Sequence, residues 1–255
     1  MSTVSPPAAR PPLVTSSVAL VGYALRACLP AKRRLALLLP CLAAVLFGAL
    51  SRGMGGDASH HFGRVAAIAL FGLVLPVTTL VVGDAVLGAE VRRGSFTFTW
   101  MSPVPAWQIV LARWVGGTAV AAGSLALAFS VAALVAGTPD SVGAVALAGA
   151  CGAAAYVAVF MAIGTIAQRA AVWSLAFVFL IERLLGAALT GIAQLSPSWE
   201  ARMAFVGRAD VSQALHREGM PEGLSALVRL LIITAVGLVV ASVRLPRLKM
   251  AGSTD

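Results

Sequence analysis

Six long apolar stretches, separated by short polar segments, constrain this chain more than any other feature. They cover residues 35–51, 65–89, 106–136, 142–167, 171–194 and 224–243. A helix needs about 20 apolar residues to cross about 30 Å of hydrocarbon, and it satisfies its own backbone polar groups there. Only 11% of the 255 residues are charged, and the mean hydropathy is +0.92. The sequence therefore predicts an all-α integral membrane protein with six transmembrane helices.

The segments outside these stretches predict two tails and one further helix. Residues 1–12 are rich in proline and small polar residues, which is typical of a disordered tail. Residues 13–34 predict an interfacial amphipathic helix followed by a basic linker. A signal peptide is the alternative, although its basic residues would precede the apolar run, whereas here they follow it. A six-helix domain then covers 35–243, and residues 244–255 form a second tail.

The basic residues gather on one side of the predicted spans. With the N-terminus inside, the inner segments carry Arg10, Arg26, Lys32, Arg33, Arg34, Arg92, Arg93, Arg169, Arg244, Arg247 and Lys249. The outer segments carry Arg52, Arg64, Arg202, Arg208 and Arg217. The positive-inside rule then predicts that both termini are cytoplasmic. This clustering accounts for the net charge of +9, so no nucleic acid partner is expected. The excess of arginine over lysine indicates a high-GC bacterial genome, and hence the bacterial inner membrane.

Several chemistries lack the residues that they require. The phosphate-binding pattern GxxxxGK[ST] does not occur, so we do not expect this chain to hydrolyse ATP. His60, His61 and His216 all fall between predicted spans, which disfavours an intramembrane metalloenzyme. His60 and His61 near Asp57 are a candidate metal site, but they lack a third convergent ligand. We therefore expect no catalytic residue, metal or bound cofactor in this chain.

Two segments carry further packing information. The fourth predicted span, 142–167, is dominated by Gly and Ala, which let helix backbones approach closely, so we expect it to lie at a helix interface. The longest outer segment, 195–223, is too polar to span the membrane. Trp199, Met203 and Val206 follow one another at helical spacing within it, which predicts one or two short amphipathic surface helices.

The polar segment 90–105 carries an aromatic cluster, "FTFTWM", between two strongly apolar stretches. Phe96 and Trp100 are four residues apart, so a short helix would present both on one side. Prolines from Pro103 onward would end this helix before the third span. An apolar helix on the cytoplasmic side favours a partner with a complementary groove. The alternative is an aromatic belt at the depth of the lipid headgroups.

The same loop and the start of the third predicted span contain a spaced set of residues: Glu90, Gly94, Ser95, Pro103, Val104 and Arg113. In this spacing it resembles the first cytoplasmic loop in the permease subunits of type-2 ABC exporters. The six-span outline, the N-terminal helix and the long last outer loop are similar too, so the resemblance covers nearly the whole chain. It implies a permease that works with two copies of a separate cytoplasmic ABC ATPase, which would bind ATP and Mg. The second permease would be another copy of this chain or a similar permease.

By this resemblance, the loop couples closure of the ATPase to rearrangement of the spans. The coupling residues would be Glu90, Gly94, Ser95, Phe96, Trp100, Met101 and Pro103. Glu90 would anchor the loop at the membrane boundary, Gly94 would permit a tight turn, and the large apolar side chains would dock on the ATPase. The substrate would be a hydrophobic or amphipathic molecule moved out of the cell. The alternative function is a membrane anchor or regulatory subunit that docks a cytoplasmic partner through this loop without transport.

The fifth predicted span carries two adjacent charges, Glu182 and Arg183, near its middle. An unpaired charge at that depth costs at least about 3 kcal/mol, so both need shelter. Adjacent helical residues point about 100° apart, so at least one needs a partner from another span or subunit. Asp84 and Arg229 lie too near the ends of their spans to be the expected partners. We expect Glu182 and Arg183 to line the translocation pathway between two copies; a structural ion pair is the alternative.

Overall fold

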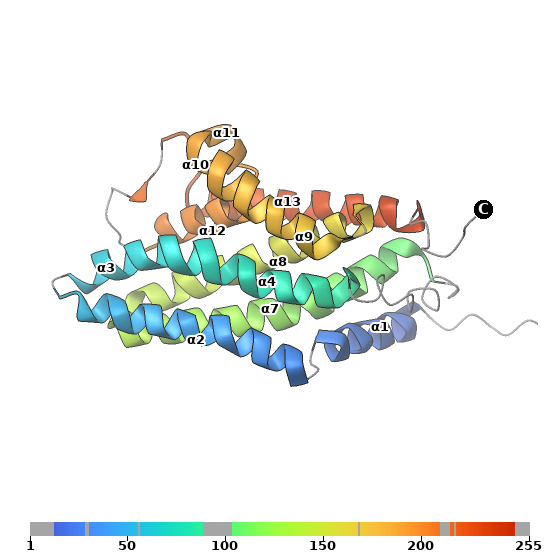
Figure 1. The fold of residues 1–255 in the computed structure, drawn as a ribbon, viewed down its shortest axis with the longest axis horizontal. Helices are drawn as coiled ribbons and strands as arrows, with labels where there is room; N and C mark the ends of the chain where they lie inside the picture. The colour runs from blue at the N-terminus through green and yellow to red at the C-terminus, as the bar shows by residue number, and fades with distance from the viewer. Residues whose placement is uncertain are drawn as a thin grey trace, which may run out of the picture.

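A computed structural model describes residues 13–28, 31–55, 57–88, 104–167, 169–209, 215–216 and 218–247. All regular secondary structure in these ranges is helical. The helices long and apolar enough to span a membrane are Leu35–Gly53, Ala58–Val86, Ala106–Ala136, Pro139–Ile166, Ala170–Ala188 and Leu224–Arg247. The predicted class, an all-α membrane protein with six spans, is therefore confirmed. The helices form one elongated bundle, and α1 and the end of α13 lie at the same end of it, here called the terminal end (Figure 1).

The first half of the bundle contains three spans and the short helix that precedes them. Its elements are α1 (Leu13–Cys28), α2 (Ala31–Gly53), α3 (Ala58–Val65), η1 (Ala66–Val74), α4 (Leu75–Gly83), η2 (Asp84–Gly88) and α7 (Ala106–Ala136). Helix α1 has 16 residues, too few to cross the hydrocarbon core, and it packs along α7. The two helices approach closely because Gly116 of α7 faces the Ala24 side chain of α1.

Two boundaries in this half differ from the sequence-based prediction. Helix α2 begins at Ala31, so the predicted basic linker before residue 35 forms its first turn instead. The second span begins at Ala58, seven residues before the predicted start at 65, so the outer loop is short. The physical reason is a helix cap: the Asp57 carboxylate accepts a hydrogen bond of 3.0 Å from the Ser59 backbone N–H.

The second half contains the remaining three spans and a folded outer segment. Its elements are η3 (Pro139–Ser141), α8 (Val142–Ile166), α9 (Ala170–Ala176), η4 (Phe177–Leu185), α10 (Gly186–Ala188), α11 (Thr190–Ala193), α12 (Pro197–Val206), α13 (Leu224–Arg244) and η6 (Leu245–Arg247). Helix α8 lies at the centre and packs against α4, α7, α12 and α13. This confirms the expectation for the Gly/Ala-rich span: Gly149 faces the Phe129 ring of α7, and Gly152 faces Ala201 of α12.

The fifth span is shorter than predicted. Its helix ends at Ala188 because Leu189 adopts an extended conformation with φ −119° and ψ 113°. Helices α10 and α11 then fold away from the axis of the span and project from the side of the bundle, above α12 in this view (Figure 1). The predicted span of 171–194 is therefore wrong at its C-terminal end.

The predicted surface helix in the outer segment forms, but it is not on the surface. Helix α12 packs between α8, α13 and η1. Met203 and Val206, from whose spacing the helix was predicted, are buried, and so are Glu200 and Ser198 on other sides. Burial on several sides means that α12 is part of the core of the bundle.

Candidate functional site

The second and fifth spans both contain a nine-residue π-helix, η1 and η4. In a π-helix each backbone N–H bonds to the carbonyl five residues earlier, and such segments occur frequently at functional sites. The Leu75 N–H accordingly donates to the Leu70 carbonyl, and the Gly186 N–H to the Ile181 carbonyl. The two π-helices are connected by a side chain, because Arg183 of η4 donates a hydrogen bond to the carbonyl of Gly72 in η1.

The sequence of η1 explains why Gly72 receives this bond. In an α-helix the Gly72 carbonyl would accept from the N–H of residue 76, but that residue is Pro76 and has no N–H. Gly72 also has no side chain, which leaves room for the guanidinium: a Cβ added there would lie 2.8 Å from Cζ of Arg183. A glycine four residues before a proline within an apolar stretch is thus the sequence signal that could have identified this partner.

The Glu182 side chain points into the bundle and is 1% exposed. The hydroxyl of Tyr156, on α8, donates to one carboxylate oxygen, and the hydroxyl of Ser196, just before α12, donates to the other. The Ser198 N–H lies 3.5 Å from the same oxygen as Ser196. The Trp199 indole N–H donates to the backbone carbonyl of Glu182 at 3.3 Å. Glu182 therefore joins the fifth span to α8 and α12.

Glu182 and Arg183 thus occupy different environments, as two adjacent helical residues must. Glu182 is enclosed by the chain's own side chains, whereas Arg183 is exposed. Because the span ends at Ala188, Glu182 lies 12 residues after its start at Ala170 and 6 before its end. It is therefore closer to the C-terminal end of the span than the predicted boundaries implied. We call Glu182, Arg183 and their partners Gly72, Tyr156 and Ser196 the mid-span polar site.

The residues assigned to the coupling loop, Glu90, Gly94, Ser95, Phe96, Trp100, Met101 and Pro103, lie outside the described residues. The structure does describe the two helices that the loop joins. Arg113 of α7 is 1% exposed, and its guanidinium donates a 2.7 Å hydrogen bond to the Val86 carbonyl of η2. On the same helix, Gln108 donates to the Ser17 hydroxyl of α1 at 2.7 Å. The base of the loop is therefore tied to both neighbouring elements.

The remaining charged candidates have other roles. Arg229 of α13 lies 3.9 Å from the Glu200 carboxylate of α12. Glu200 is fully buried, and neither of its carboxylate oxygens has a hydrogen-bond donor among the described residues. Burial raises the pKa of Glu200 to about 7, and the charge of Arg229 lowers it. The sequence did not single out Glu200 because nothing in the local pattern indicated that α12 would be buried.

The predicted metal candidates do not converge. His60 and His61 contact each other edge to face with ring centroids 5.6 Å apart. Asp57 instead accepts bonds from the side chain and backbone of Ser59, and these bonds lower the pKa of Asp57. Among the residues that the structure describes, no three His, Cys, Asp or Glu side chains are grouped to hold a metal ion.

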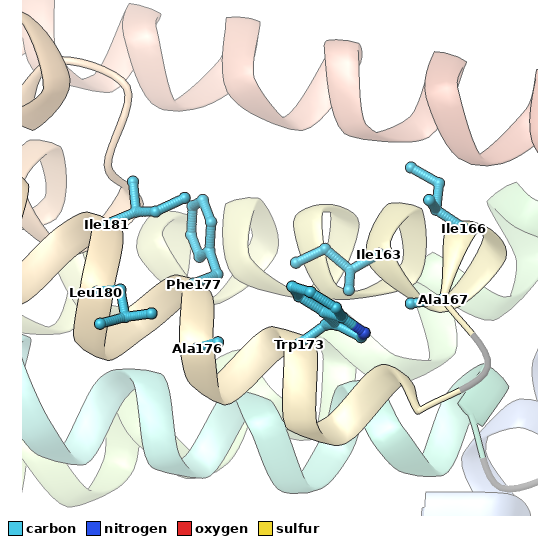
Figure 2. A pocket seen from close by; sticks show the side chains of 8 residues that line it. All are labelled: Ile163, Ile166, Ala167, Trp173, Ala176, Phe177, Leu180 and Ile181. Carbon is cyan, nitrogen blue, oxygen red and sulfur yellow. The ribbon is translucent and has the colours of Figure 1, made fainter.

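A second feature is an apolar groove at the terminal end of the fourth and fifth spans (Figure 2). It has a volume of about 520 Å³. Its walls are Ile163 and Ile166 of α8, together with Trp173, Phe177, Leu180 and Ile181 of the fifth span, and two alanines complete the lining. The lining residues are all apolar apart from the indole N–H of Trp173. The volume falls within the range of about 300–1,000 Å³ that is typical of small-molecule sites.

Neither a comparison with models of protein families nor a comparison with curated proteins found a match to this chain. The fold and the sites therefore define a class: an all-α membrane protein with six spans, a mid-span polar site and an apolar groove beside it.

Proposed function

We propose that this chain is the permease subunit of an ATP-driven exporter of the type-2 ABC class in a bacterial inner membrane. Two copies, or one copy and a similar permease, would work with two cytoplasmic ATPase subunits that bind ATP and Mg. The exported substrate would be hydrophobic or amphipathic. The proposal begins from the spacing of Glu90, Gly94, Ser95, Pro103, Val104 and Arg113. The contacts of Arg113 in the structure add physical support.

The observation that carries the proposal is the hydrogen bond from Arg113 to the Val86 carbonyl. The loop of residues 89–103 leaves η2 and enters α7, and this bond ties those two elements together at its base. Gly117 strengthens the link, because it faces the Val86 side chain and brings the helices close. A partner that pushes on the loop would then displace the second and third spans as a unit. Such a two-state displacement is what coupling to a nucleotide cycle requires.

The exposure of Arg183 is a second argument for transport. A guanidinium within the hydrocarbon core is costly unless it faces protein or water. Among the residues that the structure describes, the Gly72 carbonyl accepts a hydrogen bond from Arg183, and the side chain is otherwise largely exposed. A water-filled path between two copies of the permease would hydrate it. We therefore retain Arg183 as a pathway residue, whereas Glu182 faces the interior of the chain.

The test of coupling is the ATPase activity of the complex purified with its cytoplasmic partner. Trp100→Ala and Arg113→Lys are expected to lower this activity at least tenfold while the complex still assembles. Arg52→Gln is the matched control, because Arg52 is exposed at the opposite end of the bundle. A partner that binds no nucleotide, or unchanged activity in both variants, would support the anchor function instead.

The proposed orientation has its own test. Both termini and the loop of 90–105 are expected to be cytoplasmic, with Asp57 outside. In a background without Cys28, Cys41 and Cys151, a single cysteine at position 57 should react with an impermeant reagent in intact cells. A single cysteine at position 95 should react only after the cells are opened. The reverse pattern would invert the topology.

A further inference from the structure

We infer that the apolar groove between α8 and the fifth span binds an acyl chain of an anionic phospholipid, whose headgroup lies at Arg169 and Arg244. The lipid belongs to the leaflet at the terminal end of the bundle. This inference concerns a lipid site on one chain and is independent of coupling to an ATPase.

The shape and position of the groove fit one acyl chain. Along the fifth span the lining runs from Trp173 to Ile181, which is eight residues or about 12 Å of helix. One leaflet contributes about 15 Å to the hydrocarbon core, so the groove extends through most of a leaflet. It begins beside Ile166 and Ala167, where α8 ends, and this places its mouth at the level of the headgroups.

Dispersion contacts attract an acyl chain to this groove, because within the hydrocarbon no water is displaced from its walls. Trp173 and Leu180 are more than half exposed, and the lining offers polar contact only through the indole N–H of Trp173. A lipid chain is flexible and fills such a concave surface with dispersion contacts that a rigid helix would make only in part. A polar ligand would lose its hydration without gaining hydrogen bonds in return.

Two exposed arginines lie level with the mouth of the groove. Arg169 is exposed and precedes the first turn of α9, two residues after Ala167 of the lining. Arg244 is placed by the packing of α13 on α8, which run in the same direction: Gly237 lies against the backbone of Ala158. Seven residues further along each helix are Arg244 and Thr165, so Arg244 lies level with the end of α8. Exposed arginines at headgroup depth attract anionic lipids, each by about fivefold in affinity.

The same arginines argue against a second copy of this chain as the occupant. In a two-fold interface the same patch lies on both subunits. A two-fold interface over this groove would therefore gather Arg169 and Arg244 of both copies into one patch, where like charges repel. An anionic headgroup neutralises both.

The experiment is native mass spectrometry of the full chain released from nanodiscs. The nanodiscs contain equal amounts of phosphatidylglycerol and phosphatidylcholine with identical acyl chains. The wild-type chain is expected to retain one phosphatidylglycerol in clear preference to phosphatidylcholine. Ala176→Phe, which fills the groove, should lose this lipid, whereas Ala188→Phe at an exposed position outside the groove should retain it.

The headgroup contact is tested separately on the surface of the protein. The double variant Arg169→Gln, Arg244→Gln should lower the preference for phosphatidylglycerol by about 25-fold, which is about fivefold for each arginine. Arg64→Gln, at an exposed position at the opposite end, is the control and should leave the preference unchanged. Both surface changes leave the core intact, so they test the site even if Ala176→Phe fails to fold. Equal retention of the two lipids by the wild type, or full retention by Ala176→Phe, would overturn the inference.

Discussion

The fourth and fifth spans follow each other in the chain, yet they are held in the bundle by different means. Within the most apolar window of the fourth span 61% of the residues are buried, against 28% in the fifth. The fourth span packs through Gly149 and Gly152, where neighbouring helices lie against the bare backbone. The fifth span is attached through the polar bonds of Glu182 and Arg183 and through few close backbone contacts.

The difference indicates which part of the bundle is fixed and which part can move. Close contact between small residues is hard to rearrange, because helices must separate before they can shift. A span held by a few polar bonds can exchange one acceptor for another at low cost. The fourth span is therefore the support of the bundle, and the fifth span, with its π-helix, is the element that we expect to change position in a transport cycle.

The largest effect is expected from a bulky residue in the small-residue contacts. A Cβ at Gly237 would lie 2.9 Å from the backbone carbonyl carbon of Ala158, which cannot yield as a side chain can. Gly237→Leu should therefore destabilise the protein by about 3 kcal/mol, measured by thermal unfolding in detergent. Gly123→Leu is the matched control, because no atom lies within 4 Å of a Cβ there. Equal losses of stability in Gly237→Leu and Gly123→Leu would contradict the claim that close contacts between small residues fix the fourth span.

The second effect concerns Glu182. Glu182→Ala removes the acceptor of the buried Tyr156 and Ser196 hydroxyls, and leaving such groups unpaired costs about 2 to 3 kcal/mol. The fifth span and α12 should then exchange backbone hydrogens faster, while α8 and α13 keep their protection. Glu182→Gln keeps one acceptor and should lose less. Uniform loss of protection across the bundle would contradict a separately attached fifth span.

The third effect depends on pH and involves α12, which bridges the two spans. The pKa of Glu200 is raised by burial to about 7 from an ordinary value of 4.5. The folded state therefore binds more protons than the unfolded state between these values. The contribution of Glu200 to stability is complete below pH 4.5 and is lost as the pH rises to about 7. We expect a loss of about 2 kcal/mol between pH 5 and 7.5, measured by thermal unfolding, and no such loss in Glu200→Gln. An identical pH profile in both proteins would contradict the burial of this carboxyl.

The smallest effect on stability is expected at Gly72. Gly72→Ala displaces the Arg183 guanidinium, which is the end of a flexible and exposed side chain, and breaks one hydrogen bond worth about 1 kcal/mol. If the bond holds the fifth span in one position, export should fall more than this small loss suggests. Gly22→Ala is the control, since a Cβ there meets nothing within 4 Å. Normal export by Gly72→Ala would contradict the idea that the bond from Arg183 holds the fifth span in one position.

The positions of the spans followed from the sequence because hydropathy is a local property of each segment. The same holds for the glycines of α8, whose composition alone indicated a helix interface. The extended conformation of Leu189 and the burial of α12 depend on packing against helices distant in sequence. Tyr156 lies 26 residues before its partner Glu182, and no sequence spacing connects the two. The hydrogen bond from Arg183 to Gly72 joins residues 111 positions apart. A local sequence signal indicated its acceptor, because Pro76 has no N–H to bond the Gly72 carbonyl.

The partners of Glu182 and Arg183 have an order along the chain that bears on how the protein enters the membrane during synthesis. A helix that carries two adjacent charges inserts poorly alone, at a cost of up to about 3 kcal/mol for each charge. Gly72 and Tyr156 precede the fifth span and leave the ribosome before it, whereas Ser196 follows Glu182 by 14 residues. The fifth segment can therefore enter the bilayer against acceptors and donors already in place, and α12 completes its enclosure as the next segment to emerge.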